Sequence, residues 1–216
     1  MKFDKSQLLI YAVTDRSWTG SMSLYEQTEA ALKGGATMVQ LREKGLRDDN
    51  VEEYLEEAKK MRALTEKYNV PLLIDDNIKL AGLCGADGVH VGQNDMDAGL
   101  ARKLLGPDKI LGVTATVEQA LKAQSQGADY LGSGAVFGTS TKKDARPMTM
   151  EQLQAICASV SIPVVAIGGI CLDNIEKLKG SGAVGAAIVS GIFAAQDIEA
   201  TTRELREKME RNLLEK

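Results

Sequence analysis

Short apolar runs alternate with amphipathic helical patterns along the whole chain. Near-continuous apolar runs of this length are typical of buried parallel strands. They predict strands at 8–13, 38–41, 71–75, 88–91, 110–113, 130–133, 163–167 and 186–189. The apolar positions between them predict helices at 23–33, 51–68, 78–84, 97–105, 117–126, 150–159 and 174–179, and a charged terminal helix from 199. Eight strand–helix units are the count of a (β/α)8 TIM barrel, so we expect an α/β fold with a single domain over residues 1–216.

A Gly-Ala pair precedes every second predicted strand. The pairs are Gly35-Ala36, Gly85-Ala86, Gly127-Ala128 and Gly182-Ala183. Glycine suits the end of a helix, where the chain adopts a positive φ. Two of the intervening strands begin after a proline instead, at Pro71 and Pro163. The repeat therefore spans two strand–helix units, and it favours a barrel over a doubly wound sheet.

Composition and charge place the chain among ordinary globular proteins. Hydrophobic residues make up 44% and charged residues 26% of the 216 residues. The net charge of −4 argues against a nucleic-acid or anionic-membrane surface. Cys84, Cys157 and Cys171 are odd in number and widely spaced, so we expect reduced, packed thiols. The absence of an apolar leader or a membrane-length run predicts a cytoplasmic protein.

Carboxylates stand where two neighbouring strands are predicted to end. Asp75 ends the third strand, Asp76 follows it, and Asp95 follows the fourth strand. In one parallel sheet these side chains project from the same edge, where oxygen ligands suit Mg²⁺. The alternative is that Asp76 caps the next helix and Asp95 begins a turn. These residues alone leave both interpretations open.

The ends of the last two predicted strands favour a phosphate site. Gly168-Gly169 follows the seventh strand, and Val189-Ser190 follows the eighth. TIM barrels often bind phosphate here through backbone N–H groups, and glycine allows the close approach. Either pair alone would indicate no more than a tight turn.

Three basic residues near the predicted strand ends exceed what one phosphate requires. Arg42 and Lys44 are two positions apart on an extended segment, and Lys142 lies beside the hydroxyls of Thr139 and Thr141. Such a set suits a diphosphate that leaves with its charge neutralised by cations. The alternative for Lys142 is a solvated surface loop.

His90 is the only histidine and ends the fourth predicted strand. It cannot belong to a multi-histidine metal site. A role in contacting substrate and a plain structural role remain alternatives for it. Tyr11 and Trp18, near the first strand, are interpreted mainly as packing residues.

Six motifs in order resemble the thiamine phosphate synthase family over about residues 8–195. They are Tyr11-x-Val-Thr-Asp15, Gln40-Leu-Arg-Glu-Lys44, Gly85-Ala-Asp-Gly-Val-His-Val-Gly-Gln93 with Asp95, Gly127-Ala-Asp-Tyr-Leu-Gly132, Phe137-x-Thr-x-Thr-Lys142 and Ala166-Ile-Gly-Gly-Ile170. The resemblance implies that a hydroxymethylpyrimidine diphosphate is joined to a thiazole phosphate with release of pyrophosphate. It implies ionisation of the C–O bond first, with the cation stabilised by the ring amino group, and then attack by the thiazole nitrogen.

The resemblance also implies roles for individual residues. Asp76 and Asp95 would hold Mg²⁺ on the diphosphate. Arg42, Lys44 and Lys142 would be catalytic and, with Gln40, hold the pyrimidine and its leaving group. Thr139, Thr141, Gly169, Val189 and Ser190 would seat the thiazole phosphate. The full expected set of substrate contacts is Gln40, Leu41, Arg42, Glu43, Lys44, Asp75, His90, Thr114, Thr139, Ser140, Thr141, Lys142, Gly168, Gly169, Val189 and Ser190.

The chain departs from the family pattern at three positions. Asp75 stands where the family usually has Asn, Thr114 where it has Ser, and Gly138 where it has Pro. Thr114 keeps the hydroxyl, and Gly138 is expected to loosen its loop. A carboxylate cannot donate a hydrogen bond to a diphosphate as an amide can. We therefore hypothesise that Asp75 binds the metal directly or through water.

Two other functions are considered. A non-catalytic, phosphate-binding homologue would not need to keep the leaving-group cations of 40–44 and 139–142. An epimerase or isomerase acting on a sugar phosphate would need a paired acid and base, which the single histidine does not favour. Only the synthase would release pyrophosphate. Small-molecule substrates are the expected partners, with no nucleic acid or membrane.

Overall fold

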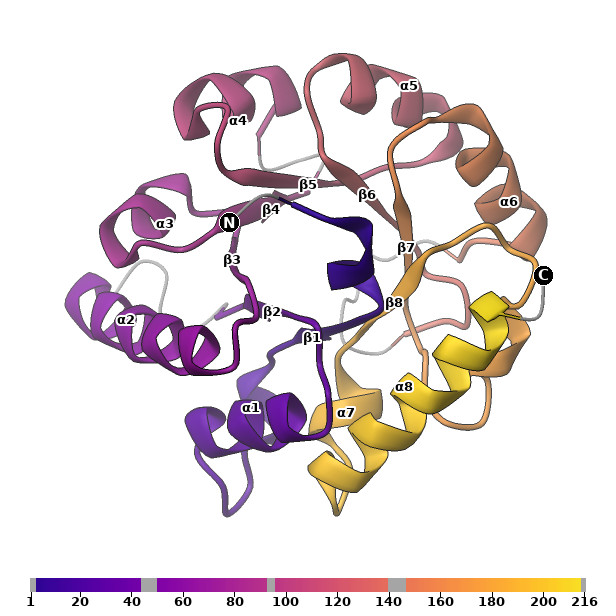
Figure 1. Ribbon diagram of the computed structural model, residues 1–216. Coiled ribbons are helices and arrows are strands. Elements are labelled where there is room, and N and C mark those ends of the chain that lie inside the picture. Colours follow the sequence, from indigo (N-terminus) through magenta and orange to yellow (C-terminus); the bar gives the residue numbers. More distant parts are fainter. Residues whose placement is uncertain (1–2, 44–49, 93–95, 140–146, 215–216) are drawn as a thin grey trace.

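Eight parallel strands close into a barrel in which each strand pairs with the next and β8 pairs with β1 (Figure 1). The computed structural model describes residues 3–43, 50–92, 96–139 and 147–214. The strands are β1 (Ile10–Val13), β2 (Met38–Leu41), β3 (Leu72–Asp75), β4 (Gly88–Val91), β5 (Ile110–Thr114), β6 (Tyr130–Gly134), β7 (Val164–Ile167) and β8 (Gly185–Ile188). The predicted (β/α)8 fold is confirmed.

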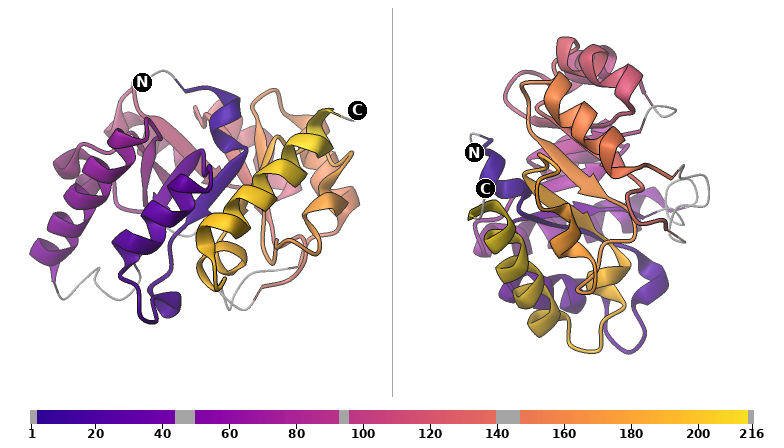
Figure 2. Two further views of the ribbon diagram at one scale, coloured as in Figure 1. Left: turned by 60° about the horizontal axis from the view of Figure 1, so that its bottom comes forward. Right: turned by 90° about the vertical axis from the view of Figure 1, so that its right-hand side faces the viewer.

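Helices surround the strands on the outside of the barrel (Figures 1 and 2). They are α1 (Leu24–Lys33), α2 (Val51–Lys67), α3 (Ile78–Cys84), α4 (Ala98–Leu105), α5 (Val117–Ser125), α6 (Met150–Ser159), α7 (Ser190–Phe193) and α8 (Ile198–Leu214). Three short 3-10 helices complete the described elements: η1 (Lys5–Leu8), η2 (Arg16–Trp18) and η3 (Ile175–Leu178).

Two predicted elements differ most from the structure, and one short helix was not predicted, each for a local reason. The first strand begins at Ile10 because Leu8 belongs to η1, which Asp4 and Gln7 close with a reciprocal capping box. The helix predicted at 174–179 is the single 3-10 turn η3. The four-residue helix α7, which follows β8 directly, was not predicted because it is too short for a helical period.

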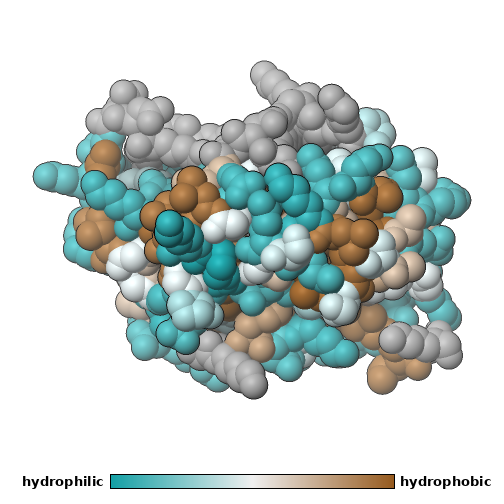
Figure 3. All heavy atoms as spheres, turned by 90° about the horizontal axis from the view of Figure 1, so that it is seen from above, coloured by the Kyte–Doolittle hydropathy of each residue, from teal (hydrophilic) through white to brown (hydrophobic). Residues whose placement is uncertain are grey.

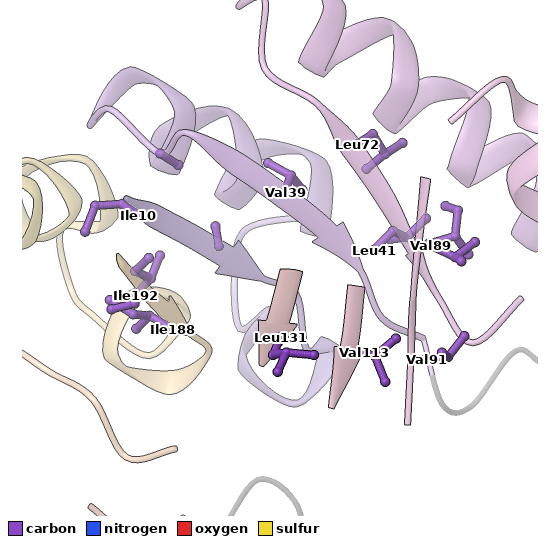
Figure 4. Packing of buried hydrophobic residues seen from close by; sticks show 14 of the residues in the cluster. Ile10, Val39, Leu41, Leu72, Val89, Val91, Val113, Leu131, Ile188 and Ile192 are labelled. Carbon is purple, nitrogen blue, oxygen red and sulfur yellow. The ribbon is translucent and has the colours of Figure 1, made fainter. Parts of the chain in front are cut away.

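Alternation along the strands separates two hydrophobic layers. Ile10, Ala12, Val39 and Leu41 pack outward with helix residues in one large cluster, part of which Figure 4 shows. The side chains between them point inward. The second cluster fills the barrel interior with Leu8, Tyr11, Val13, Met38, Leu73, Ile110, Tyr130, Val165 and Ala187.

The Gly-Ala repeat has the predicted backbone conformation. Gly35, Gly85, Gly127 and Gly182 have φ values of 98°, 71°, 91° and 87°. Each ends a helix or short turn with a left-handed residue before the chain enters the next strand. The repeat therefore marks four equivalent corners at the N-terminal end of the barrel.

The chain closes the N-terminal end of the barrel with its own first residues. Leu8 of η1 belongs to the interior cluster, and the ring of Phe3 lies 6.0 Å from the ring of Tyr130. Helix η1 and the last turn of α8 lie at this same end (Figure 2). The interior polar groups described below therefore face the opposite end.

The outer surface is mainly hydrophilic, with separate hydrophobic patches in the view over α4 and α5 (Figure 3). Leu83, Leu100, Leu104 and Leu121 are the most exposed leucines of α3, α4 and α5. Cys84 is buried, Cys157 and Cys171 are half-buried, and all three are free thiols, as their spacing predicts. Among the described residues, no helix is long and apolar enough to cross a membrane.

Candidate active site

Polar side chains replace the apolar interior at the C-terminal end of the barrel. Gln40, Asp75, His90 and Thr114 come from four successive strands, β2 to β5. Gln40 and Asp75 follow the inward-facing Met38 and Leu73 by two positions, so strand alternation turns them inward as well. Gln40, Asp75 and His90 are buried. Four positions predicted as substrate contacts are thus brought together on one inner surface.

Arg42 continues the inward-facing positions of β2 and lies between two carboxylates. Its Nη1 donates to Asp15 Oδ2 at 3.0 Å, and its Nε lies 3.8 Å from Asp75 Oδ2. The Arg42 backbone N–H donates to Thr14 Oγ1 at 2.9 Å, which fixes the residue to the end of β1. The side chains of Arg42 and Asp15 are only 12% and 14% exposed. A cation is therefore already positioned and charge-balanced at this end of the barrel.

The environment of Asp15 favours its charged form. Burial opposes ionisation, but the N–H and hydroxyl of Ser17 and the Arg42 guanidinium outweigh it, and the pKa of Asp15 falls below its ordinary value. Asp15 also caps η2 through its bond from Ser17 N at 2.9 Å. The carboxylate is thus a fixed anchor for Arg42.

Leu41 and Glu43 point away from the inner surface. Leu41 is fully buried in the outer cluster among the strands and helices (Figure 4), so its side chain does not face the site and only its backbone is available to a ligand. Glu43 Oε2 accepts from Arg16 Nε at 2.7 Å, and Arg16 also binds Glu57. Burial raises the pKa of Glu43 despite the hydrogen bond and charge of Arg16. In the described structure Glu43 joins the end of β2 to Arg16 by an ion pair. Its predicted substrate contact stays a prediction.

Asp76 does not cap the next helix. Asn77 takes that position, with its side chain accepting from Leu80 N at 2.9 Å. Asp76 instead has a positive φ of 55°, its N–H donates to His90 O, and its Oδ1 accepts from Gly92 N at 3.1 Å. These bonds hold the carboxylate beside the end of β4. The capping alternative for Asp76 is wrong, and Asp95, its predicted metal partner, lies outside the described residues.

The oxygen donors at the end of β3 fit a hard divalent cation. Mg²⁺ is usually held by one or two carboxylates together with waters and substrate phosphates. Asp76 and the adjacent Asp75 supply such groups at this end of the barrel. Within the described ranges no group of three potential metal-binding side chains occurs, so any such ion would depend on Asp95 or on a bound ligand.

A chain of hydrogen bonds crosses the barrel interior beneath these groups. Gln40 Nε2 donates to Tyr11 Oη at 2.6 Å, and Tyr11 Oη lies 3.0 Å from Tyr130 Oη. Tyr130 Oη lies 2.9 Å from His90 Nδ1, and His90 Nε2 lies 3.0 Å from Thr114 Oγ1. His90 thus joins a buried polar network that ends among the predicted substrate contacts.

Tyr11 and Tyr130 stay neutral in this network. Burial is the main reason that the pKa of each phenol is raised, and the charge of Asp75 adds to it. The sequence predicts mainly a packing role for Tyr11, and for Tyr130 no role beyond membership of its motif. Their shared inward-facing position was the available signal, but pairing them required the strand register.

The glycines after β7 are required by a neighbouring loop. Gly168 and Gly169 have φ values of 101° and 66°. A Cβ on Gly168 would lie 2.4 Å from Ala135 Cβ, and one on Gly169 would lie 2.1 Å from Gly138 O. The segment after β6 therefore packs directly on this turn. Close packing explains both glycines without a bound phosphate, so their predicted phosphate contact stays a prediction.

Asn174 fixes the same turn from the other side. Its Nδ2 donates to Gly169 O and its Oδ1 accepts from Cys171 N, both at 2.9 Å. Val189 follows β8 directly, and Ser190 begins α7. A Cβ on Gly191 would lie 2.2 Å from Ile170 O, so α7 and the turn after β7 are in close contact. The two predicted phosphate-binding segments are therefore neighbours.

Part of the predicted site lies outside the described residues. These positions are Lys44, Asp95, Ser140, Thr141 and Lys142. Thr139 is the last described residue before one of the gaps, next to Gly138. Gly138 has a φ of 72°, which proline cannot adopt, so the backbone here differs from that of a loop carrying the family's usual Pro.

Comparisons with known proteins find relatives of this chain and a solved structure with the same fold. The family model described as thiamine monophosphate synthase matches residues 10–192. The thiamine-phosphate synthase of Clostridium botulinum is 46% identical over 209 residues, covering 96% of this chain and 97% of that protein. That of Ruminiclostridium cellulolyticum is 47% identical over 204 residues, covering 94% and 96%. The structure of a thiamine phosphate pyrophosphorylase from Pyrococcus furiosus superposes with a TM-score of 0.88 and 38% identity, covering 97% of this chain and 98% of that one.

Proposed function

Because this chain belongs to the thiamine monophosphate synthase family, whose members are transferases of thiamine biosynthesis, we propose that it joins a pyrimidine diphosphate to a thiazole phosphate. The substrates are 4-amino-2-methyl-5-hydroxymethylpyrimidine diphosphate and 4-methyl-5-(2-phosphooxyethyl)thiazole. The products are thiamine phosphate and pyrophosphate. One observation carries the proposal: the interior of the barrel turns polar at its C-terminal end, where Gln40, Arg42, Asp75, His90 and Thr114 converge.

The leaving diphosphate carries the charge that the site must neutralise. Arg42 supplies a positive charge that Thr14 and Asp15 hold in place before substrate arrives, so little reorganisation accompanies departure of the anion. Lys44 and Lys142 are the further cations of this proposal. Mg²⁺, held by Asp76 and Asp95, would neutralise the diphosphate when bound.

The described residues suit a substitution that needs no general base. The C–O bond to the diphosphate breaks first, and the amino group of the pyrimidine stabilises the cation left behind. The thiazole nitrogen then attacks with a lone pair that requires no deprotonation. His90, the only histidine, is engaged by Tyr130 and Thr114 inside the barrel, which fits a supporting role.

The proposal places the thiazole phosphate at the ends of β7 and β8. Gly169, Val189 and Ser190 lie on neighbouring segments, and Ser190 adds a hydroxyl donor. Thr139 and Gly168 adjoin the same turn, and Ser140 and Thr141 follow in the sequence. Backbone N–H groups of this turn and of the first residues of α7 are the main donors offered to the phosphate.

A direct assay tests the reaction. Purified protein is mixed with both substrates and Mg²⁺, and pyrophosphate and thiamine phosphate are measured together. Equal amounts of both products, lost on chelation of the metal, are expected. Binding of either substrate without product would favour a non-catalytic phosphate-binding role instead. Turnover of a sugar phosphate without pyrophosphate would favour an isomerase.

Asp76→Asn tests the metal role within that assay. The variant should lose most Mg²⁺-dependent turnover. It should keep its thermal stability, because Asp76 lies at the end of the strand and is only partly buried. Asp108→Asn is the matched control, since this exposed carboxylate lies between α4 and β5 at the other end of the barrel. Normal turnover by Asp76→Asn would contradict the metal assignment.

Asp75→Asn tests the departure from the family pattern. If Asp75 contributes to the metal, directly or through water, the variant should need more Mg²⁺ for half-maximal turnover. In the described structure Asp75 instead lies 3.8 Å from Arg42 Nε. If the variant binds the diphosphate substrate more tightly and its Mg²⁺ requirement is unchanged, the metal hypothesis for Asp75 is wrong. The role of Asp75 would then be its contact with Arg42.

A further inference from the structure

Two glycines make room for the polar network inside the barrel. His90, Gly112 and Tyr130 stand opposite one another on β4, β5 and β6. A Cβ on Gly112 would lie 2.2 Å from Tyr130 Oη, and one on Gly132 would lie 3.0 Å from His90 Cε1. The histidine and tyrosine side chains therefore meet across a strand because the residue between them has no side chain.

The direction of the hydrogen bonds follows from counting donors. The Gln40 amide nitrogen is a donor only, so Tyr11 Oη accepts from it. Each phenol has a single hydrogen, and the described residues place no further partner on Tyr11. Tyr11 must then donate to Tyr130, since otherwise a fully buried hydroxyl hydrogen would be left unpaired.

The same count extends to the histidine. Tyr130 Oη accepts from Tyr11, so its own hydrogen goes to His90 Nδ1 at 2.9 Å. A neutral imidazole that accepts at Nδ1 carries its proton on Nε2. That proton points to Thr114 Oγ1 at 3.0 Å, so the Thr114 hydroxyl accepts from His90 and directs its own hydrogen to another partner.

We propose that Tyr11 and Tyr130 are positioning residues that form a hydrogen-bond relay from Gln40 to His90. Because the Gln40 amide donates to Tyr11, each phenol donates to the next group along the relay. The relay thereby holds His90 as its Nε2–H tautomer and orients the Thr114 hydroxyl. Both ends of the network thereby have a fixed polarity. With the Gln40 amide nitrogen on Tyr11, Thr114 is a donor on the side away from His90. This suits a heteroaromatic ligand with a hydrogen-bond acceptor near Thr114, a consequence that rests on the proposed function.

One substitution should reverse the direction of donation in every hydrogen bond of the network. In Gln40→Glu the first group is an acceptor, so Tyr11 donates to it and every later bond turns round. Tyr130 then donates to Tyr11, and Nδ1–H of His90 donates to Tyr130. The proton of His90 moves from Nε2 to Nδ1, although the substituted residue does not touch the histidine.

NMR of protein labelled with ¹⁵N-histidine reads this directly, because the chain has one histidine. Without ligand and at neutral pH, we expect the wild type to show protonated Nε2, unprotonated Nδ1 and scalar coupling of Nδ1 to the Tyr130 hydroxyl proton. Gln40→Glu should show the reverse. The double variant Gln40→Glu/Tyr11→Phe keeps the charge but breaks the relay, so it should return the proton to Nε2.

Several results would overturn the proposal. A wild-type histidine that is protonated at Nδ1 or at both nitrogens would do so, and this reading needs no variant to fold. The same histidine state in Gln40→Glu and in the double variant would show that charge, not the relay, determines the tautomer. Tyr68→Phe, which removes a phenol bonded to Glu29 on the outer surface, should leave the spectrum unchanged.

Binding of the pyrimidine diphosphate separates this inference from the proposed function. With the relay in place, Thr114→Ser should bind this ligand like the wild type, and Thr114→Val should bind it about 5- to 10-fold more weakly. No binding by the wild type would contradict the proposed function while leaving the NMR result intact. Equal binding by Thr114→Val would contradict the donor role of Thr114.

Discussion

Gly112→Ala offers a quantitative test of how the interior network is built. The new Cβ would lie 2.2 Å from both Cζ and Oη of Tyr130, far inside contact distance. The Tyr130 ring is fully buried and bonded on both sides, so it has no open space to enter. We expect the substitution to overpack the barrel and to lower its free energy of unfolding.

The magnitude follows from two opposing effects. Overpacking a dense interior costs about 1–3 kcal/mol. Alanine in a strand recovers about 0.5–1 kcal/mol relative to glycine. The net loss of stability should therefore be up to about 2.5 kcal/mol. Tyr130→Leu removes all three clashing atoms, Cζ, Oη and Cε1. That change alone should cost about 3 kcal/mol or more. Adding Gly112→Ala to it should leave only the gain of alanine over glycine, about 0.5–1 kcal/mol.

Urea unfolding followed by far-UV circular dichroism measures all four proteins of this cycle. The alanine gain is the same in both backgrounds, so the interaction energy between positions 112 and 130 should equal the overpacking cost, about 1–3 kcal/mol. Gly82→Ala is the matched control, because its Cβ meets nothing within 4 Å on α3 and it should stabilise both backgrounds equally. If Gly112→Ala costs the same in both backgrounds within about 0.5 kcal/mol, the two residues do not compete for space and the reasoning fails.

Three further substitutions test other parts of the site. Ser190→Ala should raise the KM for the thiazole phosphate about 5-fold, the effect of losing one hydrogen bond of about 1 kcal/mol, and an unchanged KM would remove Ser190 from the site. Gly138→Pro should lower the Tm by several degrees because φ is 72°, and a higher Tm would refute that backbone conformation. Asp15 stabilises the fold above its ordinary pKa of 3.8, and this contribution is lost as pH falls through the lowered native value. The stability difference between wild type and Asp15→Asn, measured in urea from pH 7 to pH 3, should therefore shrink on acidification, and a growing difference would contradict the assignment.

The strands could be predicted closely because a parallel sheet buried on both faces leaves a continuous apolar run. Strands 38–41 and 88–91 were predicted with the bounds that the structure shows. The position of the site could be predicted in the same way, because polar residues follow each apolar run where the strand leaves the buried sheet. Asp75, His90 and Thr114 do converge there, as that logic requires.

The interior network could not be predicted because its bonds join residues far apart in the sequence. Tyr11 and Tyr130 are 119 positions apart, and their contact depends on the register around the whole barrel. The role of Gly168 and Gly169 was likewise hidden, because the neighbour that excludes a Cβ comes from the segment after β6. Capping of α3 by Asn77 in place of Asp76 depends on the positive φ of Asp76, a local conformation that a non-glycine residue rarely adopts.

Closure of the barrel by β1 and β8 has a consequence for synthesis of the protein. The ribosome makes β1 first and β8 last among the strands, so one edge of β1 has no partner until Gly185 and its neighbours have been added. At about 5–20 residues per second this interval lasts roughly 10–35 s. An unpaired strand edge is a template for association with other chains. We therefore expect chains interrupted before β8 to aggregate, and the nascent enzyme to need protection until its last strand is in place.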